Sequence, residues 1–265
     1  MFNKLVPLNS KAHAGLCYYV PKSYDYARRE MLTPVLAGEA QVVAREYSFV
    51  FPRDTGGVPQ AILGIEEGVN FYAGTQPAWL ARYIPAHIRR YPFIMAPKPQ
   101  VGASHEENRQ FVVLIDEAAP QLGYDQGEPL FDQDGQPGSV LKKVQTMLIH
   151  LQRDFERTIQ LVQDIEEAGL LVERHIRVKR KKVEISGLTG FRSVDIKRLN
   201  SLPPDTLKSL TQSGALMLVY AHIISLTNLE DGLIAKKAQG QVEPADVPDF
   251  ESLFGGKDDA FRFDA

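Results

Sequence analysis

The stretch SVLKKVQTMLIHLQRDFERTIQLVQDIEEAG, residues 139 to 169, decides the fold of this chain. Apolar residues recur in it every three or four positions, and they are Val140, Leu141, Val144, Met147, Leu148, Leu151, Phe155, Ile159, Val162 and Ile165. This spacing places them along one face of an α-helix. Ser139 is suited to cap the start of such a helix and Gly169 to end it. The sequence therefore predicts one long amphipathic helix whose apolar face needs a partner.

The chain before this helix has the pattern of short strands separated by turns. SFVF (48–51), AILGI (61–65) and VNFYA (69–73) are strand-like runs. They are split by PRDTGGVP and EEG, whose glycines and prolines favour turns. We expect these three runs to form an antiparallel meander. PFIMAP (92–97) and FVVLIDE (111–117) add further strand-like runs.

Two helices are predicted among these strands. LAGEAQVVAREY (36–47) is rich in helix-forming residues. TQPAWLARYIPAHIRRY (75–91) starts as a helix, because Thr75 can cap it, and Pro85 bends or ends it. Residues four apart on such a helix share one stripe, and these are Trp79, Tyr83 and His87.

Beyond the long helix the sequence predicts a β-hairpin and a helical group. LVERHIRVKRKKVEISGL (171–188) alternates apolar and polar residues on both sides of a basic tip, RVKRKK (177–182). Three helical segments follow, at residues 193–202, 203–214 and 215–238. The expected fold is α+β, with an antiparallel sheet, the long amphipathic helix and a small C-terminal helical group packed together.

The clearest internal boundary is GEPLFDQDGQPG (127–138), in which turn residues outnumber apolar anchors. It separates a β-rich N-terminal part, residues 1–135, from residues 139–238, which hold the long helix, the hairpin and the C-terminal helices. The two parts are free to form one domain.

An acidic tail follows at residues 240–265, with seven acidic and two basic residues. Its large apolar side chains are Phe250, Leu253, Phe254, Phe261 and Phe263. The composition predicts low order. A tail whose only role is to keep the protein solvated does not need large apolar side chains. Two other roles of the tail therefore remain open. The tail either folds onto the groove of a partner or packs back on its own domain.

The overall composition of the 265 residues is that of an ordinary globular protein, with 44% hydrophobic and 24% charged residues. The net charge of −3 argues against a general attraction to nucleic acid or an anionic membrane. The single cysteine, Cys17, excludes an internal disulfide. Neither a signal peptide nor a membrane span is expected, since the longest apolar run, residues 214–226, is interrupted by Tyr220 and His222. We expect a cytoplasmic protein.

The sequence contains no phosphate-binding loop, nucleophile elbow or zinc-protease motif. None of the six histidines pairs with another at a spacing that would place two ligands on one element, so neither a metal nor a cofactor is predicted. Asp116 and Glu117 are adjacent at a strand end, where neighbouring side chains point to opposite faces and cannot act as a pair. The basic tip lacks aromatic neighbours that would stack bases, so a solvated tip is favoured over a nucleic-acid site. It can also attract the acidic tail of the same chain or of a second copy in a homo-oligomer.

YIPAHIRRYPF (83–93) concentrates aromatic, proline and basic residues, and it holds the candidate binding surface. With the preceding tryptophan, the candidate residues are Trp79, Tyr83, His87, Arg89, Arg90 and Tyr91. In one interpretation the rings wall a concave site in which an arginine holds an anion. In the other, which is favoured, the rings pack a joint between a helix and a strand, and an arginine ties down carbonyl groups or a carboxylate.

Several segments together, in this order and spacing, resemble the SapC family of bacterial proteins. They are MFNKLVPLNSKAHAGL (1–16), AREYSFVFPRD (44–54), AILGIEEGVNFYA (61–73), YIPAHIRRYPF (83–93), GLTGFRSVDIKRLNSLP (187–203) and SGALMLVYAHIISL (213–226). The resemblance implies an association with bacterial surface layers and serum resistance. It also implies a place beside flavin-dependent halogenase-like enzymes and outer-membrane receptors in bacterial genomes. It supplies no catalytic residues.

The predicted function is that of a non-enzymatic accessory protein that binds a peptide or protein partner in a process of the bacterial cell envelope or surface layer. The alternative is an enzyme, or an essential subunit of one, that acts on a peptide or small acidic substrate and is linked to halogenase-like modification. That alternative needs His87, Arg90 and Asp116 to converge on one pocket. Binding of RNA or DNA through the basic tip is a third hypothesis.

Overall fold

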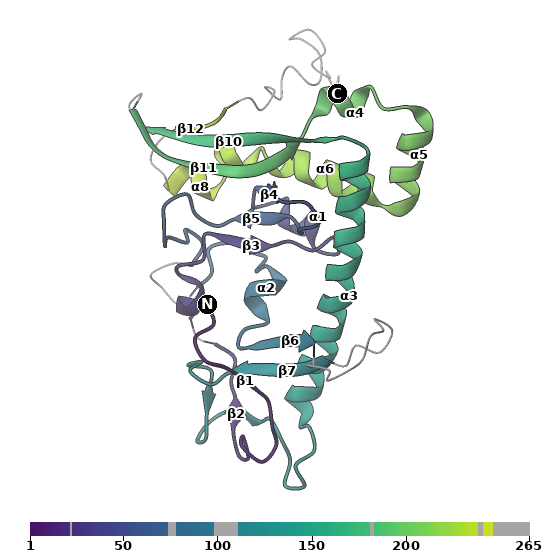
Figure 1. The fold of residues 1–265 in the computed structure, drawn as a ribbon. Helices are drawn as coiled ribbons and strands as arrows, with labels where there is room; N and C mark the ends of the chain where they lie inside the picture. Colours follow the sequence, from purple (N-terminus) through teal and green to yellow (C-terminus); the bar gives the residue numbers. More distant parts are fainter. Residues whose placement is uncertain (22, 74–77, 98–110, 181–182, 238–240, 246–265) are drawn as a thin grey trace, which may run out of the picture.

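The computed structural model describes residues 1–21, 23–73, 78–97, 111–180, 183–237 and 241–245. One long helix, α3 (Ser139–Glu167), stands along one side of the molecule and passes three antiparallel sheets (Figure 1). A group of short C-terminal helices lies at the same end of the molecule as the largest sheet (Figure 1). The predicted α+β class, with its long helix and C-terminal helical group, is confirmed.

The N-cap residue of helix α3 lies one position earlier in the chain than the sequence predicts. Gly138 holds the N-cap position and Ser139 is the first helical residue, whose hydroxyl donates to Glu128 at 2.8 Å. At the other end Gly169 adopts a φ of +68°, which favours glycine. The Gly169 amide donates to the carbonyl of Glu166 and the Leu170 amide to that of Ile165, which together form a Schellman motif. The predicted glycine stop is therefore confirmed.

The largest sheet has six strands in the order β12-β10-β11-β4-β5-β3, with every pairing antiparallel. The strands are β3 (Leu32–Pro34), β4 (Phe49–Pro52), β5 (Gln60–Ile62), β10 (Leu171–Arg180), β11 (Val183–Val194) and β12 (Gln241–Ala245). The predicted hairpin is confirmed as β10 and β11. Phe191 and Arg192 extend the sheet by pairing with β4, and β12 adds to the outer side of β10.

Two smaller sheets lie beside the first half of α3. One has the order β1-β7-β6 and the other the order β8-β2-β9. Their strands are β1 (Leu5–Pro7), β2 (Cys17–Tyr18), β6 (Phe93–Pro97), β7 (Phe111–Asp116), β8 (Leu122–Gly123) and β9 (Glu128–Pro129). Three later strands, β7, β8 and β9, therefore pair with the N-terminal strands β1 and β2 before the chain enters α3.

Helix α3 contributes to two hydrophobic clusters. Val144 and Leu148 in its first half pack in the smaller cluster, beside the β1-β7-β6 sheet. Leu161, Val162 and Ile165 in its second half pack in the larger cluster, beside the six-stranded sheet. Complete burial of one such side chain stabilises the fold by roughly 1.5–3 kcal/mol. The apolar face of α3 therefore contributes to the stability of both clusters.

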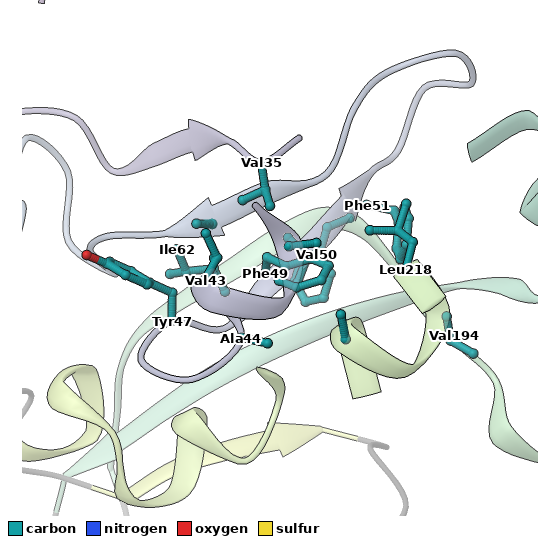
Figure 2. Close-up of a cluster of buried hydrophobic side chains, with 14 of the residues drawn as sticks. Val35, Val43, Ala44, Tyr47, Phe49, Val50, Phe51, Ile62, Val194 and Leu218 are labelled. Atoms are coloured by element: carbon teal, nitrogen blue, oxygen red, sulfur yellow. The ribbon is translucent and has the colours of Figure 1, made fainter. Parts of the chain in front are cut away.

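The centre of the larger cluster lies between the six-stranded sheet and the helices. Figure 2 shows Phe49, Val50 and Phe51 of β4 between the short helix α1 (Ala40–Val43) and Leu218. Phe49 and Phe51 are fully buried. β-Branched and aromatic residues suit such a pleated, covered surface.

The closing helix predicted over residues 215–238 is divided in the structure. The C-terminal group consists of α4 (Ile196–Asn200), α5 (Pro204–Ser213), α6 (Ala215–Ser225), α7 (Asn228–Asp231) and α8 (Leu233–Lys237). The Asn228 amide explains the first break, because it donates to the carbonyls of Ala44 and Tyr47 and holds the chain against α1. No single helix of the described chain has the length and apolar character to cross a membrane, although α5 and residues 215–237 meet that standard jointly across a 90° bend.

The N-terminal half contains less regular structure than predicted. The helix expected over residues 36–47 is reduced to the single turn of α1, and a 3₁₀ turn, η1 (Asp25–Ala27), precedes it. Residues 69–73 form no strand, because the Asn70 side chain accepts hydrogen bonds from the amides of Tyr72 and Ala73 and curls the chain.

The helix predicted from Thr75 is also wrong over the residues that the structure describes. Residues 78–84 are not helical, and only α2 (Ala86–Arg89) follows Pro85. The Glu46 carboxylate is the reason, since it accepts from the backbone amides of Arg82 and Tyr83 that a helix would have used internally. Thr75 itself lies outside the described residues.

Candidate functional site

The helix α2 brings two of the predicted binding residues together. Pro85 has an extended backbone and cannot continue a preceding helix, so a new turn begins at Ala86. The Ala86 amide donates to the Glu39 carboxylate at 2.9 Å, which fixes the start of that turn. His87 and Arg90 are three residues apart and therefore share one side of the turn, where Arg90 Nη2 lies 2.9 Å from His87 Nε2.

His87 and Arg90 line a pocket of about 290 Å³. The rest of its lining comes from the segment at β3, from β6 and from the middle of α3: Pro34, Leu36, Met95, Leu148, Leu151, Gln152 and Phe155. The pocket therefore has mostly apolar walls and one basic corner. Such a combination suits a ligand with an apolar body and a polar or charged end.

The basic corner carries one charge at neutral pH. Burial, together with the smaller effect of the neighbouring Arg90 cation, lowers the pKa of His87 to about 3, so His87 is neutral. Burial also lowers the pKa of Arg90, to about 10, which leaves its guanidinium protonated. Because Arg90 can only donate, His87 Nε2 is the acceptor between them and the His87 proton lies on Nδ1.

The Arg90 guanidinium is not neutralised by a carboxylate in the described part of the chain. Its Nε is buried and has no hydrogen-bond partner there, and the Phe2 ring lies 5.9 Å from its Cζ. A partly buried cation without a counter-ion is costly, and an incoming anion would lower that cost.

The other predicted binding residues serve internal contacts and do not line this pocket. Trp79 is buried and donates from Nε1 to the Tyr47 hydroxyl at 2.6 Å. The Tyr83 hydroxyl donates to Glu39 at 2.7 Å, and burial together with that carboxylate raises the pKa of Tyr83 to about 12. Arg89 donates to the carbonyl of Ile84 and to the Tyr83 hydroxyl. These contacts match the interpretation of a packed joint.

Tyr91 and Asp116 also belong to the scaffold. Tyr91 is buried, and its hydroxyl donates to Asp116 Oδ2 at 3.1 Å. Asp116 accepts three further hydrogen bonds from the amides of Asn3, Lys4 and Ala118. The convergence of His87, Arg90 and Asp116 that an enzyme would need is therefore incomplete, since Asp116 is not among the residues that line the pocket.

The apolar walls of the pocket were missed by the sequence analysis as site residues. Leu148, Leu151 and Phe155 were assigned to the core face of the long helix, and only Leu148 is fully buried. Phe155 is 37% exposed, which shows that the middle of this face is left partly uncovered. A periodic pattern reports which face is apolar, and it does not report where the partner of that face ends.

Three other predictions concern a metal site, the basic tip and the acidic tail. No group of three or more His, Cys, Asp or Glu residues with metal-binding geometry exists among the described residues. For the basic tip, the structure describes the strand backbones on both sides, and residues 181–182 lie outside the described residues. The predicted partner-docking residues of the tail, Phe250, Leu253, Phe254, Phe261 and Phe263, lie outside the described residues.

The SapC family model matches residues 8–231, which is most of the chain and includes α2, α3 and the pocket between them. No curated protein and no solved structure matches the chain.

Proposed function

Because this chain belongs to the SapC family, we propose that it is an accessory protein that binds a peptide or protein partner in a process of the bacterial cell envelope or surface layer. The proposed contact is the pocket between α2 and α3. Its partner group combines an apolar side chain with a carboxylate, as the C-terminal residue of a peptide does.

The observation that carries this proposal is the Arg90 guanidinium, which has no counter-ion among the described residues and lies in a mostly apolar pocket. A carboxylate can accept two parallel hydrogen bonds from a guanidinium, which fixes its orientation as well as its charge. The apolar walls at Leu151 and Phe155 would cover an aliphatic or aromatic side chain. The volume of about 290 Å³ suits one residue better than a large cofactor.

The enzymatic alternative has weaker support. The group in the pocket best placed for proton transfer is His87, and its pKa of about 3 makes it a poor base at neutral pH. The acid that the alternative requires, Asp116, is held by four hydrogen bonds of the scaffold. Binding without chemistry therefore agrees better with this geometry.

Replacing Arg90 by methionine tests the anion-binding role. The probes are fluorescent hexapeptides that end in leucine or phenylalanine, each with a free or an amidated C-terminus. We expect wild-type protein to bind the free form at least about tenfold more tightly, because a charge-assisted hydrogen bond is worth roughly 1.5–3 kcal/mol. In Arg90→Met this preference should vanish in a fluorescence-anisotropy titration.

The matched control is Arg89→Met, which changes the adjacent arginine outside the pocket. It should keep the preference for the free carboxylate. Equal binding of free and amidated peptides by the wild-type protein would contradict the proposed ligand class.

Deletion of residues 246–265 tests the proposed docking role of the tail and leaves β12 in place. We expect recovery of a partner from its native cell extract to fall several-fold, since the deletion removes all five large apolar side chains of the tail. A second variant with those five residues changed to alanine keeps the charge and the length. Unchanged recovery with both variants would remove the tail from the binding mechanism.

A further inference from the structure

A second pocket, of about 450 Å³, lies where the pairing of β2 with β8 ends. Its lining includes Tyr19, Pro21, Asp25, Tyr26, Pro120 and Gln121. None of them belongs to the Arg90 pocket.

Gln121 is the unusual member of this lining. It is only 1% exposed, yet neither its Nε2 nor its Oε1 has a hydrogen-bond partner in the described chain. Buried side-chain amides normally have their polar atoms paired. Because both atoms are unpaired, rotating the amide by half a turn would not change this observation. The pocket therefore contains a donor and an acceptor that the described part of the chain leaves unused.

The two prolines explain why the chain itself does not fill this place. The Tyr19 amide donates to the carbonyl of Gln121 at 3.0 Å, which extends the pairing of β2 and β8 by one residue. Pro21 and Pro120 have no N–H, so the ladder cannot continue on either strand. The Tyr19 hydroxyl donates to the carbonyl of Pro120 and closes the end of the ladder. Among the described residues, no backbone group pairs with the Gln121 side-chain amide beyond that point.

One wall of the pocket is held by internal contacts, and the described walls carry no unpaired charge. Tyr26 stacks on Tyr91 with ring centroids 4.3 Å apart, and its hydroxyl donates to the carbonyl of Ile88. Asp25, the charged member of the described lining, is already paired with Arg28. The described walls therefore favour a neutral ligand, in contrast to the anion that suits Arg90.

We infer that this second pocket binds an extended peptide segment through its main chain. In an extended peptide the N–H and C=O of one residue point to the same side, and the Gln121 amide offers the matching acceptor and donor in one plane. The tyrosine and proline walls cover the flanking side chains, as in other aromatic-lined peptide grooves. This site goes beyond the proposed function, because it recognises a segment within a chain and requires no free carboxylate.

The test uses the peptide Ala-Thr-Val-Thr-Ala, acetylated at its N-terminus and amidated at its C-terminus. It has no carboxylate, so its binding does not depend on the Arg90 pocket. In a titration of the ¹⁵N-labelled full chain, the side-chain amide signals of Gln121 should shift and saturate. Methylation of the central peptide nitrogen should weaken binding at least tenfold, and so should Gln121→Leu.

Gln121→Leu also has a stability readout. Because the amide has no partner in the described chain, its removal should leave the melting temperature unchanged or raise it. The matched control Gln160→Leu changes an exposed glutamine of α3 and should leave peptide binding intact. A fall of several degrees in Gln121→Leu, unchanged affinity for the methylated peptide, or saturable binding of maltohexaose in place of the peptide would overturn the inference. Arg90→Met should bind this probe as the wild type does, so failure here and failure of the proposed function are distinguishable.

Discussion

Replacing Asp116 by alanine is expected to lower the free energy of unfolding by about 3 kcal/mol, because a buried carboxylate that accepts several hydrogen bonds would be lost. Asp116 is fully buried and accepts from the amides of Asn3, Lys4 and Ala118 and from the Tyr91 hydroxyl. Alanine would leave all four donors without this acceptor. The measurement is a urea unfolding curve followed by tryptophan fluorescence and by circular dichroism.

The neighbouring residue provides the control. Glu117 is partly exposed and pairs with the exposed Lys4, and its other contact is to the buried His13 Nε2 at 3.2 Å, so Glu117→Ala should cost much less than Asp116→Ala, about 1 kcal/mol. Burial alone would raise the pKa of Asp116, but the three amides and the Tyr91 hydroxyl outweigh it and the pKa lies below its ordinary value. The contribution of Asp116 is thus present above its unfolded pKa and is lost as the pH falls through the folded pKa. Equal effects of the two substitutions would show that Asp116 does not anchor the N-terminal segment.

Long periodic elements could be predicted from the sequence because they carry their own signal. Helix α3 repeats its apolar spacing over eight turns, and the sequence of the β10–β11 hairpin alternates on both sides of the basic run at residues 177–182. The breaks that were missed come from single side chains that compete with the backbone. Glu46 takes the amides that a helix at residues 78–84 needs, and Asn70 does the same to a strand. Such competition depends on residues 36 positions away or on one rotamer, and a local pattern does not contain it.

In the candidate site, too, the residues with an unusual local composition were predicted, whereas those brought in by packing were not. The sequence selected His87 and Arg90, because an arginine beside a histidine and several rings is an unusual composition. It also selected Trp79 and Tyr91, which the fold buries for internal hydrogen bonds. Half of the apolar wall, Leu148, Leu151 and Phe155, comes from α3, about 60 residues further along the chain. Only the packing of α3 beside α2 and β6 turns an ordinary helical face into the wall of a pocket.

Lowering the pH from 7.5 to 4.5 should reduce the stability of the protein through His222. This histidine is fully buried in α6, accepts at Nε2 from the amide of Val194 and lies 3.0 Å from the Ser193 hydroxyl. Its Nδ1 donates to the carbonyl of Phe49 at 2.8 Å. Burial lowers the pKa of His222 to about 4, although the bond to Phe49 acts in the opposite direction.

The sign of the effect follows from the two pKa values. In the unfolded chain a histidine takes up a proton near pH 6.5, whereas folded His222 stays neutral down to about pH 4. The stabilising contribution is therefore complete above pH 6.5 and declines as the pH falls toward 4. The loss approaches about 1.4 kcal/mol per pH unit and about 3 kcal/mol in all. Urea unfolding at half-unit pH intervals measures it.

The variant His222→Gln separates this group from the others that titrate in the same range. Glutamine can still donate toward Phe49 and accept from Val194, but it takes up no proton. The variant should be less stable than wild type at pH 7.5, and the difference should shrink steadily toward pH 4.5. His87, whose pKa is also lowered, and Glu39, whose buried carboxyl has a raised pKa, change stability in opposite directions but do so in both proteins. Their effects cancel in the difference between the two proteins. A difference that stays constant with pH would show that folded His222 takes up a proton at the same pH as in the unfolded chain, so that its pKa is not lowered. In that case the contacts that join α6 to β4 and β11 would have to be assigned differently.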